Sequence, residues 1–398
     1  MAGKNINRVA IVGAGPAGLT AALTAQKLGL AVKVFEQAAD FKQVGGGIGI
    51  HSNGQRVLNA LGLLESFLPS MVLVEKGTIE GLRGKILAEI DFTELDIPFN
   101  QMAVILRYQL QEHLLAAAEK AGIEVKFDCR LENLNINKNR AELKFENGAE
   151  NIADIVIAAD GVNSRVREAS GINFRKITVG EGWLRGLSDY KLSDRAFREI
   201  WGDDGRRFGI VPLTDDKLYF YARVPLGKWE TIRENSLDEW IESWRDFKDA
   251  AKILQNVENW QKVNYSELFE IRADNWAKPP VFLVGDAAHS MTPNVGQGAN
   301  SAMVDALVLM RMLAGAEKTG KSPEEIGREY TALRRPFVTK TQTMARQIGK
   351  LAANTSASAH LLRDILFATA KHLGFLRRKS MQFSTGFHPP ENEFFTPF

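Results

Sequence analysis

The sequence predicts an α/β fold in which a nucleotide-binding domain is interleaved with a mainly antiparallel β domain, and a helical segment ends the chain. Strand–glycine loop–helix units at 8–29 and 281–307 predict the first domain. Alternating apolar and polar positions over much of 179–271 predict the second. Helical periodicity in 341–398 predicts the C-terminal segment.

Composition and length limit the classes of function. The 398 residues, 45% hydrophobic and 25% charged, are typical of a globular protein with two or three domains. A net charge of +2 without a dense Lys/Arg patch argues against nucleic acid as a partner. No run reaches the ~18 apolar residues of a membrane span, and the lone Cys129 suits a reducing compartment, so we expect a soluble cytoplasmic protein. The sequence lacks hydrolase and metal motifs, so we predict no metal site.

The first glycine loop lies between a strand at 9–12 and a helix at 16–28, with glycines at three fixed positions. We expect Gly13 to permit the tight turn, Gly15 to let the backbone approach a pyrophosphate, and Gly18 to let the helix pack closely on the strand. The N-terminus of that helix offers free N–H groups to phosphates. The loop therefore predicts a dinucleotide site.

Glu36 ends the next strand, about 20 residues further on, where the dinucleotide fingerprint requires an acid. A carboxylate there accepts hydrogen bonds from both ribose hydroxyls and repels a 2′-phosphate, so the site should hold FAD or NAD and not NADP. The alternative is a plain βαβ unit whose glycines serve only packing.

The middle of the chain holds a glycine cluster at 45–49 and an arginine, Arg107, at a strand–helix junction. So many glycines suggest backbone that passes close to something flat or bulky, although a surface loop would look similar. Arg107 could reach phosphate or ribityl oxygens, or could be a surface residue at a helix start.

The segment 217–224 alternates cleanly, with Tyr219 and Tyr221 on one face of a strand. That face is either the floor of a pocket for a planar substrate or an exposed aromatic face. Further on, 360–383 is basic and amphipathic, which fits a membrane surface, a partner or the protein's own domain. We expect it to pack on its own domain, and therefore expect no membrane contact.

The second glycine unit delivers Asp286 after a strand at 281–284, and its helix begins near Gly298. No acid follows a further strand, so this unit is not a second dinucleotide site. It could instead serve the other end of one FAD, with Asp286 on the ribityl hydroxyls. The helix N-terminus would then favour negative charge near the flavin N1–C2=O position.

Four motifs together resemble one family. GAGPAG with Glu36, Arg107 after VIL, AADG at 158–161 and GDAAHSMTPNVGQGANSAMVDA occur in the same order in the class A FAD-dependent monooxygenases, the family of p-hydroxybenzoate and salicylate hydroxylases. The resemblance covers about 8–309. It implies a Rossmann-like FAD-binding domain, with NADH or NADPH as a transient co-substrate. The FAD-binding residues it implies, together with those above, are Gly13, Gly15, Ala17, Gly18, Glu36, Gly47, Arg107, Asp160, Asp286, Pro293, Gly296, Gly298, Ala299 and Asn300.

The resemblance also implies a chain that threads back and forth between two domains. The FAD-binding domain is predicted to be discontinuous, and the strand-rich segments between its parts form the substrate domain. The predicted boundaries are 1–71, 99–178 and 272–340 for the FAD-binding domain, 72–98 and 179–271 for the substrate domain, and 341–398 for the C-terminal helical segment.

The implied activity is hydroxylation of an aromatic or heteroaromatic small molecule. NAD(P)H reduces FAD, O₂ adds at C4a to give a hydroperoxide, and one oxygen atom passes to the substrate. By position in the family's strands, Arg207 and Tyr219 are predicted substrate contacts, with Arg185 and Tyr221 behind them. An arginine there suits an anionic or carbonyl-bearing ring. The alternative is that Arg206 and Arg207 are a solvated pair at a strand end.

Other functions stay open on the same fold. These are a flavin-dependent reductase or saturase that transfers hydride without oxygen, an epoxidase, and a non-catalytic FAD-binding protein. The sequence does not choose NADH over NADPH, does not name the substrate, and leaves open whether the protein forms a homodimer.

Overall fold

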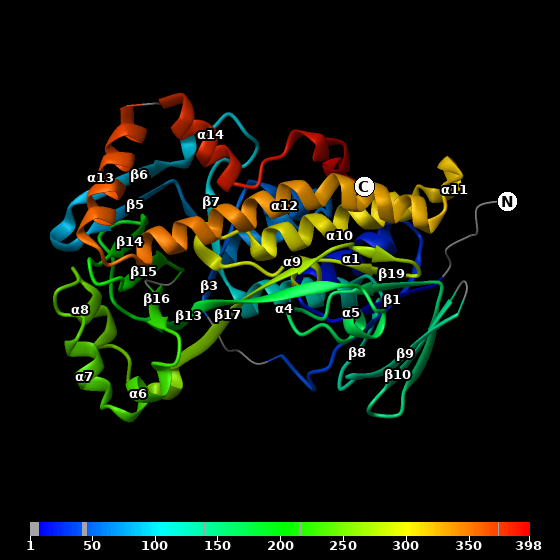
Figure 1. Ribbon diagram of the computed structural model, residues 1–398. Coiled ribbons are helices and arrows are strands. Elements are labelled where there is room, and N and C mark those ends of the chain that lie inside the picture. The colour runs from blue at the N-terminus through cyan, green and yellow to red at the C-terminus, as the bar shows by residue number, and fades with distance from the viewer. Residues whose placement is uncertain (1–7, 42–45, 138–139, 215–216, 373) are drawn as a thin grey trace.

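The two main sheets of the protein are joined by one long helix. The structure is a computed structural model that describes residues 8–41, 46–137, 140–214, 217–372 and 374–398. Helix α12 (Pro323–Ala353) runs the length of the molecule (Figure 1). Near its start, a Cβ at Gly327 would lie 2.6 Å from Ala277, at the edge of the first sheet. Near its end, Ala352 packs against Trp201 of the second sheet.

The first sheet has six strands, and its neighbouring strands are parallel except at one edge. Its strands read as short apolar runs because helices cover them. In spatial order they are β18 (Ala277–Lys278), β19 (Val281–Leu283), β12 (Ile155–Ala158), β1 (Arg8–Val12), β2 (Ala31–Phe35) and β8 (Glu124–Lys126).

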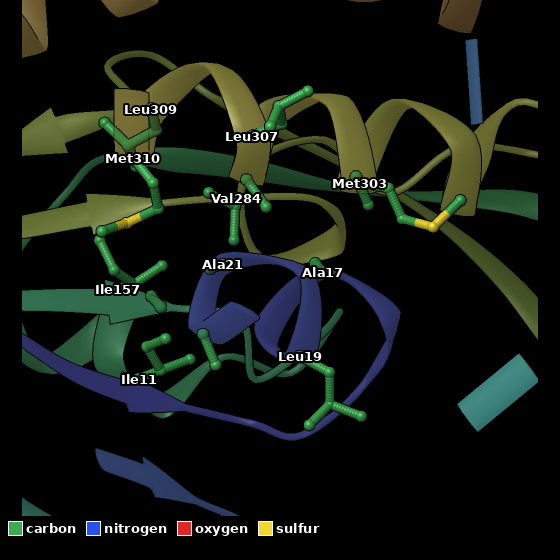
Figure 2. Packing of buried hydrophobic residues seen from close by; sticks show 14 of the residues in the cluster. Ile11, Ala17, Leu19, Ala21, Ile157, Val284, Met303, Leu307, Leu309 and Met310 are labelled. Carbon is green, nitrogen blue, oxygen red and sulfur yellow. The ribbon is translucent and has the colours of Figure 1, made fainter. Parts of the chain in front are cut away.

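Two helices from distant parts of the chain pack closely on this sheet. Figure 2 shows α1 (Pro16–Lys27) beside α10 (Gly298–Ala314), with Ala17 and Ala21 of α1 facing α10. Small side chains allow this approach, and a Cβ at Gly285 would lie 2.7 Å from the Cβ of Ala302. Packing therefore brings the two glycine units of the sequence together.

The second sheet has seven strands and is antiparallel except where β14 pairs with β5. Its strands come from two separate stretches of the chain. In spatial order they are β17 (Val263–Ala273), β13 (Phe174–Ser188), β16 (Leu218–Pro225), β15 (Arg207–Pro212), β14 (Phe197–Trp201), β5 (Lys76–Gly81) and β6 (Ile86–Asp91). The mainly antiparallel second sheet was expected, whereas the domain boundaries stay a prediction.

Smaller elements complete the fold. Two further sheets have three strands each: β3 (Gly47–Ile50), β7 (Met102–Leu106) and β4 (Val72–Val74), and β9 (Leu131–Asn137), β10 (Arg140–Phe145) and β11 (Glu150–Ala153). The remaining helices are α2 (Ser52–Ala60), α3 (Leu64–Phe67), α4 (Arg107–Lys120), α5 (Arg165–Ala169), α6 (Trp229–Glu234), α7 (Leu237–Glu242), α8 (Ala250–Leu254), α9 (Asp286–His289), α11 (Ala316–Thr319), α13 (Ala357–His372) and α14 (Gly374–Ser384).

The alternating strand β16 buries one face fully and the other face in part. Leu218, Phe220 and Ala222 belong to one apolar cluster, as the alternation predicted. On the other face, Tyr219 is only 8% exposed and packs in a second cluster. The alternative of an exposed aromatic face is therefore wrong for Tyr219. Among the described residues, none of the helices is both long enough and apolar enough to span a bilayer.

Candidate functional site

Glu36 stands at the carboxyl end of β2, beside the first glycine turn. One carboxylate oxygen accepts the N–H of Ala14 at 2.7 Å, and the other accepts the N–H of Ala38 at 2.9 Å. These bonds hold the carboxylate in place, and each oxygen keeps a second acceptor position. The two adjacent hydroxyls of a ribose can donate hydrogen bonds to those positions.

The three glycines of the turn have different roles. A Cβ at Gly13, where φ is +102°, would lie 2.4 Å from the carbonyl oxygen of Ala159, and one at Gly18 would lie 1.9 Å from the carbonyl oxygen of Gly13. Both glycines are therefore required by the packing of the chain itself. A Cβ at Gly15 would meet nothing within 4 Å. Gly15 precedes α1 and leaves open space at the N-terminus of that helix, where a phosphate group fits.

Asp160 follows β12 and carries an unpaired acceptor. Its Oδ2 accepts the N–H of Val166 at 3.1 Å, whereas its Oδ1 is buried without a hydrogen-bond partner. Burial raises the pKa of Asp160, although the hydrogen bonds from Ser164 and Val166 oppose that rise. A buried acceptor without a partner is one that a ligand donor can satisfy.

Asp286 is the first residue of α9 and is reached by solvent, yet burial raises its pKa. Its carboxylate therefore lies in a recess. His289 and Arg107 oppose the rise, so Arg107, the first residue of α4, lies within electrostatic reach. Arg107 is exposed, as are Pro293 and Gly296 of the loop before α10. Arg107 and the accessible residues of the stretch from Asp286 to Gly296 thus come from two distant segments, and Arg107 acts on the Asp286 carboxylate, as expected for the flavin end of FAD.

Asn300, a predicted cofactor residue, uses its side chain inside the protein. Its Oδ1 accepts the N–H of His51 at 3.0 Å, and its Nδ2 donates to the carbonyl oxygens of Gly49 and Gly296 at 2.9 and 2.8 Å. Asn300 therefore ties β3 to the loop before α10. Only backbone groups of the first turn, those of Gly298, Ala299 and Asn300, are left for a ligand.

The predicted contact residue Ala17 is 9% exposed and packs near the missing side chain of Gly285, at 3.5 Å from an added Cβ. Its small size helps to join the two glycine units. Gly47 begins β3, and a Cβ there would lie 3.2 Å from the ring of Tyr219. Gly46 and Gly47 of the glycine cluster therefore lie against the second sheet, whereas Gly45 lies outside the described residues.

Arg207 is 1% exposed and links the second sheet to the loop before α10. Its Nε donates to Glu199 Oε1 at 2.8 Å, and its Nη1 donates to Asn294 Oδ1 at 2.7 Å. The ring of Trp201 lies 5.5 Å from the guanidinium carbon. The alternative of a solvated Arg206–Arg207 pair is wrong for Arg207, whereas Arg206 makes surface ion pairs with Asp204 and Asp246.

The two tyrosines of β16 have polar partners on neighbouring strands. Arg185 donates a hydrogen bond to Tyr219, and burial nevertheless raises the pKa of that phenol. Tyr221 bonds to Glu199, and burial and the Glu199 charge raise its pKa well above the ordinary value. A chain of contacts therefore runs from Tyr221 through Glu199 and Arg207 to the loop before α10.

Sequence reasoning missed His51, which lies directly after β3. A Cβ at Gly296 would lie 2.8 Å from His51 Nε2, so the ring packs on the loop. Its Nδ1 is buried without a partner, and burial lowers the pKa of His51 to about 4. A neutral imidazole beside the predicted flavin space can donate or accept one hydrogen bond. Its position between a glycine cluster and a helix start was the available signal.

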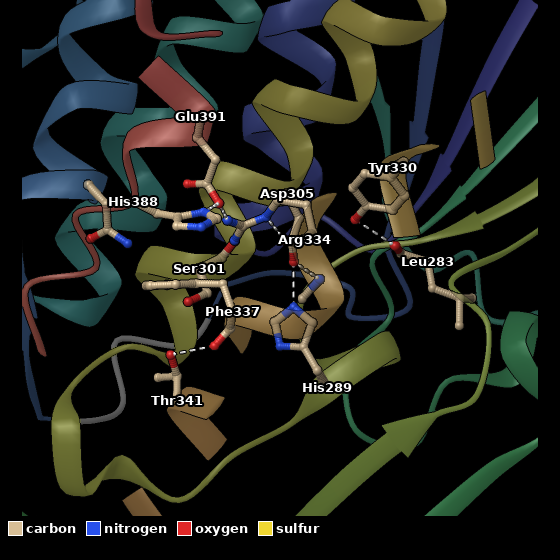
Figure 3. A network of polar contacts seen from close by, with 12 residues as sticks. Leu283, His289, Ser301, Asp305, Tyr330, Arg334, Phe337, Thr341, His388 and Glu391 are labelled. Atoms are coloured by element: carbon tan, nitrogen blue, oxygen red, sulfur yellow. Dashed lines mark hydrogen bonds and ion pairs between the residues drawn. The ribbon is translucent and has the colours of Figure 1, made fainter. Parts of the chain in front are cut away.

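Sequence reasoning also missed a buried network of hydrogen bonds and ion pairs that includes His289 of α9 (Figure 3). Asp305 Oδ2 accepts the N–H of Gly285 at 3.1 Å and bonds His289, while Oδ1 accepts Arg334 Nε at 2.8 Å. Arg334 also pairs with Glu391 near the C-terminus. Burial would raise the pKa of Asp305, but His289 and Arg334 hold it below its ordinary value. The signal was an aspartate among the apolar residues in the middle of a helix.

Comparisons with known proteins agree on the cofactor class. The family model described as "FAD binding domain" matches residues 7–345. The chain is 27% identical over 350 residues to a probable 2-heptyl-3-hydroxy-4(1H)-quinolone synthase of Rhodococcus erythropolis, covering 85% of this chain and 86% of that protein. It is 29% identical over 312 residues to an FAD-dependent urate hydroxylase of Mycolicibacterium vanbaalenii, covering 76% and 78%. HpxO of Klebsiella pneumoniae, solved with FAD and uric acid, has the same fold, with a TM-score of 0.82 at 20% identity over 95% of this chain and 97% of that one.

Proposed function

Because the chain belongs to the class A FAD-dependent monooxygenases, we propose that it hydroxylates a planar, uncharged heteroaromatic small molecule held beside Tyr219 and the Arg207–Asn294 contact. The enzyme is an oxidoreductase that uses FAD, with NADH or NADPH as the reductant. When bound, FAD accepts a hydride from the nicotinamide and activates O₂. The protein orients the substrate and excludes water.

Four groups would hold FAD in this proposal. Glu36 binds the adenosine ribose, and the open space at Gly15 admits the pyrophosphate. Asp286 and Arg107 flank the ribityl chain, because both are accessible and Arg107 acts on the Asp286 carboxylate. The first turn of α10 lies at the flavin, where its N–H groups favour negative charge. The fit of these donors and acceptors supports the assignment.

The single observation that carries the substrate proposal is the pairing of Arg207 with Glu199. The guanidinium lies 2.5 Å from the carboxylate and both side chains are buried, so the pair presents no net positive charge. Arg207 therefore offers no net charge with which to bind an anionic ring. Tyr219 and neutral His51 are uncharged partners for ring nitrogens, carbonyls or hydroxyls.

The decisive experiment follows NAD(P)H oxidation and oxygen incorporation together. The purified holoenzyme is mixed with neutral heteroaromatics, such as 4-quinolones, and with anionic rings, such as salicylate. We expect neutral rings to stimulate NAD(P)H oxidation and to gain one labelled oxygen atom from ¹⁸O₂. Product without label, formed equally well without O₂, would establish the reductase alternative. Ligand binding without any NAD(P)H oxidation would establish the non-catalytic alternative.

The location and the assembly of the enzyme belong to the same proposal. Cys129 is buried and unpaired, which supports a reducing cytoplasm. A homodimer stays a prediction, which light scattering of the purified protein tests.

A further inference from the structure

The C-terminal segment from α13 onward packs on the rest of the protein. The ring of Phe367 on α13 lies 5.7 Å from that of Trp201, and the ring of Phe383 on α14 lies 4.9 Å from that of Phe337 on α12. The expectation that the stretch 360–383 packs on its own domain is therefore correct for these side chains. The turn that follows α14 extends to the loop before α10.

Gln297 is the residue of that loop which contacts the turn. It lies between Gly296 and Gly298, both of which are predicted to contact FAD, and it is fully buried. Its Nε2 donates to the carbonyl oxygen of Ser384 at 2.8 Å, and its Oε1 accepts a hydrogen bond from Asn53 Nδ2 at 2.9 Å. Because the side chain is buried and both ends of its amide are bonded, Gln297 can affect a ligand only through its neighbours.

The C-terminal turn, residues 384–386, fits closely against this amide. Gly386 has a φ of +74°, and a Cβ there would lie 2.0 Å from Asn53 Nδ2 and 2.6 Å from Gln297 Oε1. A residue with a side chain would be strained in that conformation and would displace the amide pair, so the position requires glycine. The turn and the pair of Gln297 with Asn53 therefore form one packed unit.

Residues just after the turn are anchored on α12. Glu391 pairs with Arg334 of α12 and bonds His388 (Figure 3). The ring of His388 also stacks on that of Phe337 at 4.5 Å. The position of the C-terminal turn is therefore set by contacts other than the one with Gln297, and the turn offers that side chain a fixed partner.

Three amide side chains hold the loop before α10 from three directions. Asn294 accepts a hydrogen bond from Arg207 of the second sheet, and Asn300 donates one to Gly49 of β3. Gln297 supplies the third contact, to the C-terminal turn. The match to the FAD-binding family model ends at residue 345, so this third contact joins the loop to a part of the chain outside that match.

Gln297 is also the N-cap residue of α10. Its carbonyl oxygen accepts the N–H of Ser301 at 2.8 Å, which begins the helix. A shift of the Gln297 backbone would therefore turn the free N–H groups of the first helical turn. Those groups favour negative charge at the proposed flavin position, and reduction makes the flavin more negative. The affinity for reduced relative to oxidised FAD should thus depend on how Gln297 is held.

We propose that Gln297 is a positioning residue for the flavin, and that the C-terminal turn holds the start of α10 in place through it. This inference rests on the proposed placement of FAD at α10, and it adds the C-terminal turn to the parts of the chain that set the reduction potential of FAD. Loss of the contact should make bound FAD harder to reduce while the substrate contacts stay in place.

The test is the midpoint potential of FAD in the holoenzyme, measured by equilibration with a redox dye in the absence of substrate. Gln297→Met keeps the length of the side chain and removes both hydrogen bonds. We expect the affinity for reduced relative to oxidised FAD to fall about fivefold, which lowers the potential by about 20 mV, since tenfold corresponds to about 30 mV for two electrons. Gly386→Ala, whose Cβ presses on the same amide pair, should lower the potential as well.

The matched control is Thr396→Val, which removes the hydrogen bond from Arg311 Nη1 to Thr396 Oγ1 at 2.8 Å. This bond joins the C-terminal segment to the last turn of α10, so its loss should leave the potential as in the wild type. In the double variant, the effects of Gln297→Met and Gly386→Ala should not add, because the turn acts through Gln297.

The inference is overturned if Gln297→Met keeps the wild-type potential, if Thr396→Val lowers it equally, or if the two effects add. Should Gln297→Met retain no FAD, the potential of Gly386→Ala decides in its place. The measurement uses no substrate, so its result is independent of whether a ring is hydroxylated. A wild-type protein that binds no FAD would instead refute the proposed function.

Discussion

At the scale of single residues, a substitution in the first glycine turn can remove ligand binding without preventing folding. Gly15→Val should fold, because an added Cβ meets nothing within 4 Å, but its branched side chain should fill the space proposed for the pyrophosphate. We expect FAD content per chain, measured by absorbance, to fall about tenfold or more, with the unfolding transition of the apoprotein nearly unchanged. Gly374→Val, at another open position, should keep its FAD. Normal FAD content in Gly15→Val would remove the assignment of this turn to FAD.

Tyr219→Phe tests the substrate side of the site. The change removes only the hydroxyl that Arg185 contacts, so FAD binding should be unaffected. We expect KM for the substrate to rise about tenfold, as for the loss of one hydrogen bond, and more NAD(P)H to be consumed without product. Tyr265→Phe is the control, because Tyr265 stacks on Trp229 away from the glycine cluster. Equal kinetics in the two variants would show that Tyr219 does not touch the substrate.

His51 should make the protein sensitive to acid. Burial lowers its pKa from 6.5 to about 4, so between these values the unfolded chain binds a proton that the folded chain excludes. The free energy of unfolding should therefore fall by about 3 kcal/mol as pH decreases through this window, with the full stability present above it. Urea unfolding of His51→Gln should show a shallower pH dependence. A wild-type pH dependence in that variant would show that His51 does not exclude a proton in this way.

At the scale of elements, Asp305 joins four parts of the chain. It contacts Gly285, His289 and Arg334, and Arg334 contacts Glu391. Asp305→Asn should cost about 3–5 kcal/mol, because it leaves a buried arginine with one fewer anionic partner. Chemical denaturation measures this cost. Glu242→Gln, which breaks an exposed pair with Arg245, should cost less than about 1 kcal/mol. Equal effects would show that the buried network contributes little.

For the alternating strand β16, the sequence predicted the strand and its two faces correctly but did not predict what packs against them. The period of two in 217–224 predicted which residues share a face, because that period is a local property of extended backbone. It could not predict that Tyr219 on the second face is also covered, since Gly46 and Gly47, which pack against it, belong to a distant segment.

At the scale of the molecule, the C-terminal segment is part of the fold although the family match ends at residue 345. Glu391 is 1% exposed and pairs with Arg334, and Met381 packs against Leu95 and Ile97. A chain that ends after Ala353 should therefore lose at least about 3–5 kcal/mol of stability and retain less FAD. Thermal unfolding and FAD absorbance check both. Glu391→Gln in the full chain separates the lost charge from the lost packing, and wild-type stability in the truncated chain would contradict the prediction.

The sequence by itself determined the dinucleotide turn, the acid after β2 and the second glycine unit, because their chemistry depends on spacing along a few consecutive residues. Only the tertiary structure decided what surrounds them. Packing between segments that are distant in the sequence produces the contact of Arg207 with Asn294, the neutral His51 and the Asp305 network. Charge compensation and burial are properties of the folded surroundings, so a pattern of residue types along the chain does not contain them.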